Sequence, residues 1–225
     1  MARRSPTARA AELAFDAISI EGGLLAADWL SRAAQLKAPY QDPADYGVPK
    51  GIELRDEIGR SWRIAQAHWA EFEAGRKAKA EPGALSRRFV LSLLREALAF
   101  SDSVEREQPL VLDERSFPLT AIDSAGRVPV VTVAAPSERS SKKSALDEPH
   151  AHLGDEHRKR SAFGLVQEFL NASKDALWGL TSDGLTLRIV RDNASLTRPA
   201  WIEIDLARIF TEGLYPDFAA TWLVL

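Results

Sequence analysis

Six basic residues in the second half of the chain could contact phosphate groups. Three precede an apolar segment, two lie on an alternating segment and one follows it: Arg158, Lys159, Arg160, Arg188, Arg191 and Arg198. Arginine and lysine neutralise phosphates, and this attraction weakens as salt is added. A solvated charged surface is the simpler interpretation of such a cluster. We nevertheless expect any nucleic-acid contacts of the chain to come from these residues, with double-stranded DNA as the partner.

A carboxylate followed by an apolar run has the outline of a nuclease core of the PD-(D/E)xK type. Asp123 and a turn precede the β-branched segment 128–134. In such a core an acid and a lysine on the strand join the aspartate to hold Mg²⁺ and position water. The corresponding positions here hold Thr132 and Ala134. An active metal site is therefore not expected, although a nuclease-like fold without its metal ligands remains compatible with the sequence.

Three histidines and two aspartates are the other candidate metal ligands. These residues are His150, His152, His157, Asp147 and Asp155. Their spacing matches no closed structural metal site, and a polar tract of this composition is first a solvated linker. The chain has no cysteine, which excludes disulfides, thiolate nucleophiles and cysteine-ligated zinc. We therefore predict no metal site.

Several catalytic motifs are absent from the sequence. It contains no phosphate-binding Gly-x-x-x-x-Gly-Lys-Ser/Thr loop, no Gly-x-Gly-x-x-Gly and no Gly-x-Ser-x-Gly. An Asn-Pro-Pro-Tyr-type tetrapeptide, which an adenine-N6 methyltransferase uses to hold a flipped base, is also absent. We accordingly assign no catalytic residue and no cofactor to this chain, and do not expect it to be an enzyme by itself.

Composition and charge place the chain among ordinary globular proteins. Its 225 residues suffice for one large domain or two small ones, and its net charge of -3 gives no general attraction to nucleic acid or membrane. The N-terminal region lacks the continuous apolar stretch of a signal peptide. No segment reaches the roughly 18 apolar residues of a membrane span. We expect a cytoplasmic protein without a membrane partner.

Apolar periodicity predicts the elements that would position these residues. Helical spacing predicts two short helices over 7–18 and 24–36, then longer ones beginning near Ile52 and at Ala84. The aromatic face of the third helix (Trp62, Trp69 and Phe72) is interpreted as core rather than as a binding site. Strands are predicted over 109–112, 117–122 and 128–134, followed by a helix near 163–170, a hairpin with an Asp183-Gly184 turn, and a strand over 201–205.

These elements predict an α+β fold, with an N-terminal helical region followed by a small mixed-sheet α/β domain. Residues 1–100 form the helical region, and 101–135 contribute the strands of a degenerate restriction-nuclease-like core. Residues 136–160 are predicted to be a mobile charged linker. The last part, 161–225, contains a helix, the hairpin, a strand and the start of a helix. Nothing closes that helix, so we expect the sequence to end inside it, as a fragment would.

Several segments together carry a resemblance to a known family. The segments are 165–171 (LVQEFLN), 177–198 (LWGLTSDGLTLRIVRDNASLTR), 202–210 (IEIDLARIF), 19–25 (SIEGGLL) and 60–62 (RSW). They resemble the N-terminal region of large adenine-specific DNA methyltransferases. These methyltransferases belong to bacterial phage-defence systems of the BREX and DISARM kind and to fused type II restriction–modification enzymes.

The resemblance implies that this chain precedes a methyltransferase domain. The S-adenosylmethionine loop and the Asn-Pro-Pro-Tyr motif would then lie beyond Leu225, and no catalytic residue is carried over to this chain. The expected function is a non-catalytic part of a DNA-modifying defence protein that contacts DNA, the downstream domain or other defence-system subunits. A stand-alone protein-interaction module without a catalytic half is the alternative. A Mg²⁺-dependent nuclease is a further alternative, which would depend on Asp123.

Overall fold

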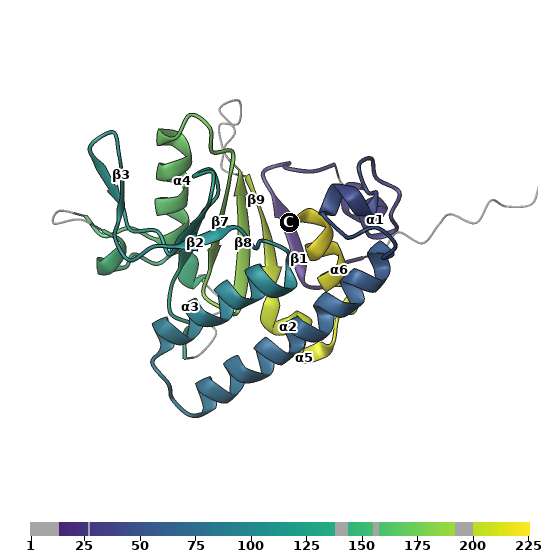
Figure 1. Ribbon diagram of the computed structural model, residues 1–225. Helices are drawn as coiled ribbons and strands as arrows, with labels where there is room; N and C mark the ends of the chain where they lie inside the picture. Colours follow the sequence, from purple (N-terminus) through teal and green to yellow (C-terminus); the bar gives the residue numbers. More distant parts are fainter. Residues whose placement is uncertain (1–13, 27, 138–143, 155–157, 192–199) are drawn as a thin grey trace, which may run out of the picture.

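The computed structural model describes residues 14–26, 28–137, 144–154, 158–191 and 200–225 (Figure 1). Its strands are β1 Ile18–Glu21, β2 Ser103–Glu105, β3 Leu110–Leu112, β4 Arg115–Phe117, β5 Ala121–Asp123, β6 Pro129–Thr132, β7 Trp178–Ser182, β8 Thr186–Arg191 and β9 Ala200–Asp205. Seven of them form one mixed sheet in the order β1-β9-β8-β7-β6-β5-β2, and β3 and β4 form a separate hairpin. Within the large sheet β6 and β7 are parallel, whereas the other neighbouring strands are antiparallel.

Helices cover both faces of the large sheet. The α-helices are α1 Trp29–Ala34, α2 Leu54–Lys77, α3 Pro82–Ser92, α4 Ala162–Ala172, α5 Leu206–Glu212 and α6 Tyr215–Val224. The shorter helices are η1 Pro43–Tyr46, the π-helical η2 Leu93–Ala97 that continues α3, η3 Ala145–Asp147 and η4 Ala151–Leu153. Helix α4 packs on one face of the sheet, and α2, α3, α5 and α6 lie on the other (Figure 1). The α+β class predicted from the sequence is confirmed.

The two faces of the sheet bury separate apolar clusters. Along β8, Leu187 and Ile189 belong to the cluster beneath α2, α3, α5 and α6, whereas Val190 belongs to the cluster beneath α4. The period-two alternation of β8 therefore sorts its side chains between two covered faces. The sequence predicts a half-buried strand here. The prediction is wrong because α4 covers the face that was expected to meet solvent.

Helix α2 is the long aromatic helix that the apolar spacing predicts near Ile52. Leu54, Ile58 and Phe72 are buried in the larger cluster. Trp62 and Trp69 stack on Phe210 of α5, with ring centroids 5.5 and 5.3 Å apart. The interpretation of this aromatic face as core is confirmed.

The β7–β8 hairpin turns one residue later than the sequence predicts. The Asp183 amide donates to the Thr186 carbonyl at 3.3 Å, so Gly184 and Leu185 are the central turn residues. Gly184 has φ 89°, as the first central residue of a II′ turn requires. A Cβ on Gly184 would lie 2.8 Å from Cζ of Phe72. The hairpin tip is therefore buried beneath α2 and must carry glycine.

The N-terminal region contributes a strand to the sheet, where the sequence predicts a helix through residue 18. Strand β1 pairs antiparallel with β9, with Ile18 opposite Ile204 and Ile20 opposite Ile202. The helical prediction is wrong for the described residues because the partner strand lies near the other end of the chain. The predicted helix at 24–36 shortens to α1.

The connection from β6 to β7 crosses the sheet through α4. Its described part includes η3 and η4, whose Leu146 and Leu153 are buried in the cluster beneath α4. Two buried leucines therefore anchor part of the segment 136–160, which is predicted to be a mobile linker. Among the described residues no helix combines the length and the apolar character that crossing a membrane requires.

Candidate functional site

A hollow of about 530 Å³ opens where β6 ends, next to the start of β5. Its walls come from the first turns of α3 and from the segments 106–109, 118–120, 132–134 and 152–153. Open α/β sheets bind ligands outside the carboxyl ends of parallel strands, where neighbouring connections diverge. β6 belongs to the sheet's single parallel pair of described strands, so the topology favours a site at this end.

Two threonines form the sheet side of the hollow. The hydroxyl oxygens of Thr120 and Thr132 lie 3.0 Å apart, and Oγ1 of Thr120 also accepts a hydrogen bond from the Thr132 amide at 2.8 Å. Both residues are buried. Thr132 stands at one of the two positions where the nuclease pattern needs its strand acid and lysine. The geometry instead provides a neutral hydroxyl pair.

Arg106 supplies a cation to the wall beside the threonines. Its backbone amide donates to the Thr120 carbonyl at 2.9 Å, which fixes the residue against the sheet. Its Nε is shielded from solvent and has no hydrogen-bond partner within the described chain. Arg87 braces the same segment, since it donates to the Arg106 carbonyl at 3.1 Å and pairs with Glu105 at 2.7 Å.

Glu81 lies at the rim of the hollow, where α3 begins. Its carboxylate accepts hydrogen bonds from the amides of Gly83 and Ala84, at 2.8 and 2.5 Å. The hydrogen bond from the Ala84 amide, and to a smaller extent that from the Gly83 amide, lowers the pKa of Glu81. The carboxylate is therefore the N-cap of α3, a role that anionic side chains fill well.

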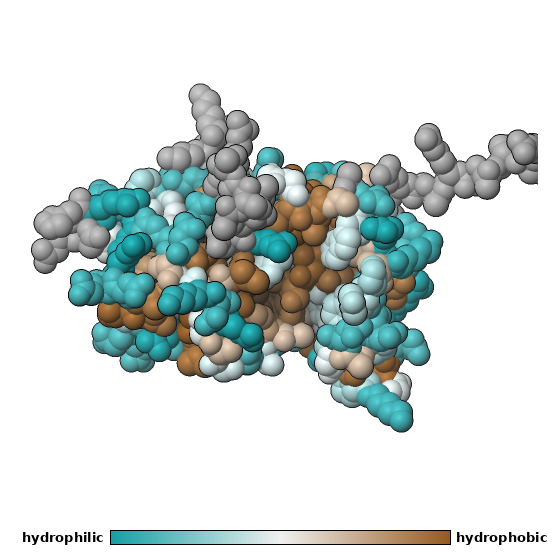
Figure 2. Space-filling model, turned by 90° about the horizontal axis from the view of Figure 1, so that it is seen from above, coloured by the Kyte–Doolittle hydropathy of each residue, from teal (hydrophilic) through white to brown (hydrophobic). Residues whose placement is uncertain are grey.

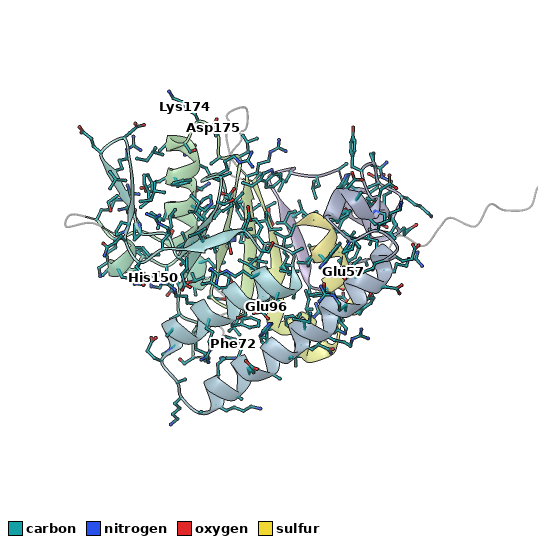
Figure 3. The ribbon with its side chains drawn as sticks, viewed as in Figure 1. Glu57, Phe72, Glu96, His150, Lys174 and Asp175 are labelled. Carbon is teal, nitrogen blue, oxygen red and sulfur yellow. The ribbon has the colours of Figure 1, made fainter. Side chains whose placement is uncertain are left out.

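His152 completes the opposite wall. Burial, and secondarily the nearby His150, lower the pKa of His152, which favours its neutral imidazole. The two rings are 5.4 Å apart, and His150 lies beside the lower end of α4 (Figure 3). The described residues contain no group of three or more His, Asp or Glu side chains placed to hold a metal ion. His157 and Asp155, the other predicted ligand candidates, lie outside the described residues.

Asp123 has a structural role at the opposite end of β6. Its Oδ1 accepts hydrogen bonds from the amides of Arg127 and Val128, at 2.5 and 2.6 Å, and so closes the β5–β6 turn. At about 3.3 Å per strand residue, Thr132 lies about 13 Å farther along β6 than Val128. Asp123 therefore cannot share a metal with groups at the end of that strand.

Arg188, one of the six predicted DNA contacts, is buried inside the protein. Its side chain is 4% exposed and bonds to Asp147 at 2.8 Å and to Glu203 at 3.0 Å. Its guanidinium carbon lies 4.8 Å from the ring centre of Phe163 and 5.0 Å from that of Trp201. Burial opposes its charge, but the bonds to Asp147 and Glu203 raise the pKa of Arg188. The prediction for Arg188 is corrected, because these contacts leave a phosphate no access.

The basic run before α4 divides between surface and interior. Arg160 is buried, its Nη1 lies 3.5 Å from Glu168, and its carbonyl accepts the His150 amide at 2.8 Å. Arg158 is exposed and pairs with the same Glu168 at 2.9 Å, and Lys159 is also exposed. Arg158 and Lys159 are therefore the members of this run that a ligand can reach.

Arg191 is exposed at the end of β8, away from that run. Its guanidinium lies over Trp178, 5.1 Å from the ring centre. Arg191 lies opposite Trp178 in the strand register, at the end of the sheet where β6 and β7 begin. It also follows the alternation of Leu187 and Ile189, so it projects on the face opposite α4. The structure therefore does not bring the predicted basic residues together. Arg198 lies outside the described residues.

Sequence reasoning missed the residues around the hollow. Arg106 and Thr120 belong to no motif, and their proximity depends on pairing between β5 and β6 and on the position of α3. A weak signal was available, because Thr132 stands where the nuclease pattern requires charge. Compared with protein-family models, curated proteins and solved structures, the chain gives no significant match.

Proposed function

We propose that the chain is a non-catalytic N-terminal part of an adenine-specific DNA methyltransferase of the phage-defence or restriction–modification type, contributing contacts rather than chemistry. One observation supports the non-catalytic part of this proposal. At the end of β6, where a nuclease of this outline needs an acid and a lysine, Thr132 bonds to Thr120. A hydroxyl pair cannot substitute for carboxylates as Mg²⁺ ligands. The family itself rests on the sequence resemblance, and S-adenosylmethionine belongs to the domain expected downstream.

DNA contact in this proposal rests on the exposed members of the predicted set. Lys159 and Arg158 lie before α4, and Arg191 lies at the end of β8. Arg198 follows Arg191 in the sequence and stays a predicted contact. Helix α4, with 11 residues, is about 16 Å long. The two groups are therefore far apart, and Arg191 projects on the face of the sheet opposite α4, so each group would contact its own stretch of phosphate backbone.

Salt-dependent duplex binding tests this function. Affinity measured by fluorescence anisotropy between about 50 and 200 mM salt should fall steeply, because bound cations are released from DNA. Lys159→Ala with Arg191→Ala should reduce the slope of log K against log salt by about two, one for each lost phosphate contact. Lys50→Ala, at an exposed position remote in sequence, is the control. An unchanged slope in the double variant would sink the DNA-contact proposal.

Plasmid incubation with Mg²⁺ tests the non-catalytic part of the proposal. We expect no cleavage. Cleavage that Asp123→Ala abolishes would refute the proposal and restore the nuclease alternative.

A stand-alone interaction module remains the second candidate, because one end of the molecule shows apolar surface. Apolar residues gather in the middle of the face seen from above, with hydrophilic residues around them (Figure 2). Leu177, which precedes β7, is 55% exposed. Absence of duplex binding together with a stable monomeric chain would favour this module over the DNA-contacting part.

A further inference from the structure

The hollow at the end of β6 has the volume of a small-molecule site. Its volume of about 530 Å³ falls within the 300–1,000 Å³ that such sites usually occupy. Apolar side chains, among them Leu119 and Leu153, line it together with the hydroxyl pair of Thr120 and Thr132. This mixture suits a compact body that offers both apolar surface and hydrogen-bonding groups.

The charges around the hollow leave one cation uncompensated within the described chain. Glu105 is paired with Arg87 at 2.7 Å and lies 3.9 Å from Arg95, and Glu81 is directed to the α3 amides. No ion pair between Arg106 and a described carboxylate is present, and its shielded Nε has no partner there. Partial burial of an unpaired cation is unfavourable, and an anionic oxygen entering the hollow would offset that cost.

The rim selects against large polyanions. Glu81 and Glu107 are exposed and both line the hollow. Their negative charges repel a nucleic-acid backbone, which presents a phosphate at every nucleotide. A small molecule with a single acidic group can meet Arg106 while leaving both carboxylates in solvent.

We propose that this hollow binds a small molecule of nucleoside size or smaller that carries one carboxylate or phosphate group, with Arg106 as its anchor. The anionic group bonds to the guanidinium, and the body lies between Leu119, Leu153 and the threonine hydroxyls. This inference is independent of the proposed DNA contacts, which use other residues. The carboxylate and the phosphate present the same chemistry to Arg106, and the probes below distinguish them.

Calorimetric titration of the full chain tests the site with three probes. Adenosine 5′-monophosphate and benzoate carry the phosphate and the carboxylate, and adenosine is the matched neutral compound. We expect saturable binding of at least one anion at millimolar concentration and at least about tenfold weaker binding of adenosine, as loss of a charge-assisted hydrogen bond implies. Absence of binding by both anions, or equal binding of adenosine and its monophosphate, overturns the proposal.

Variants at Arg106 test the anchor. Arg106→Gln keeps an amide donor but removes the charge. The dissociation constant of the anionic probe should therefore rise at least about tenfold. Arg106→Lys should recover part of the affinity. Arg115→Gln, at an exposed position of β4 that does not line the hollow, should bind as the unchanged chain does. Unchanged affinity in Arg106→Gln, with an unchanged circular dichroism spectrum, overturns the proposal.

A second variant tests the charge argument without removing a contact of Arg106. Ala84 is exposed in the first turn of α3 and lines the hollow. Aspartate there suits a helix N-terminus, so Ala84→Asp should fold. Its added negative charge should weaken binding of the anionic probe several-fold and leave adenosine unaffected. Equal weakening of both probes would show steric blockage and overturn the charge argument.

Discussion

Replacing Arg188 with methionine tests whether this buried guanidinium is a structural centre of the fold. Methionine keeps an unbranched apolar stem between Phe163 and Trp201 but removes every bond to Asp147 and Glu203. Asp147 lies in η3 and Glu203 in β9, so the arginine joins the β6–β7 connection to the sheet. We expect the variant to unfold more easily and to expose the segment around η3 to proteolysis.

The size of the effect follows from exposure. Each hydrogen bond to a charged group contributes about 1.5–3 kcal/mol, but the Asp147 and Glu203 side chains remain 36% and 33% exposed. Water therefore recovers part of their solvation in the variant, and removing the buried cation also relieves its own desolvation cost. We estimate a net loss of about 3 kcal/mol of unfolding free energy. For a chain of this length that is a fall in Tm of about 6–12 °C.

Thermal and urea unfolding measure the loss. Arg158→Met is the matched control, because Arg158 also pairs with a carboxylate but is 68% exposed in its side chain. Exposed pairs contribute at most about 1 kcal/mol, so the control should lose no more than that. A loss below about 1 kcal/mol in Arg188→Met would refute the reasoning, because surface pairs reach the same value.

Two further predictions concern the turn glycine and a buried acid. Gly184→Ala should cost about 2–4 kcal/mol, since it combines a positive φ with a 2.8 Å approach to Phe72. Gly126→Ala, which has φ 73° and open space around it, should cost only about 1 kcal/mol in urea unfolding, and equal costs would contradict the predicted clash. Burial raises the pKa of Asp217, although the hydrogen bond that its carboxylate accepts from the Ala17 amide at 2.8 Å acts to lower it. The protonated Asp217 carboxyl therefore makes its full contribution to the free energy of unfolding below the unfolded pKa of about 4. This contribution is lost as the pH rises through the folded pKa. The asparagine in Asp217→Asn cannot titrate, so the variant does not lose this stability as the pH rises. The unfolding free energy of the variant minus that of the unchanged chain should therefore increase from about pH 3 to pH 7. A constant difference would contradict the raised pKa of Asp217.

Local patterns in the sequence predict the elements whose burial depends on near neighbours. The spacing of Leu54, Ile58 and Phe72 predicts α2, and the β-branched run 128–134 predicts β6. Strand β1 escaped prediction because its four residues acquire strand geometry from β9. The β7–β8 turn shifted by one residue because the approach of Gly184 to Phe72 is a tertiary contact.

The candidate site was less accessible to sequence reasoning. The sequence predicts that Arg188 is a surface cation, because its partners Asp147 and Glu203 are 41 and 15 residues away and no local pattern connects them to it. Nothing local distinguishes it from Arg191, which shares its strand and remains exposed. Likewise, Arg106 and Thr132 meet at one hollow only after β5 and β6 have paired and α3 has packed beside them.

The pairing of β1 with β9 has a consequence for the order of folding. The bond between Ala17 and Asp217 joins residues 200 positions apart, so closing this contact carries a large entropic cost. Contacts of such separation form slowly, after the local pairing of β7 with β8 has provided a surface. Until β1 docks, one side of β9 presents unpaired backbone groups that another chain can join. Once docked, β1 is the edge of the described sheet, and its four residues present a shorter open edge than the six residues of β9.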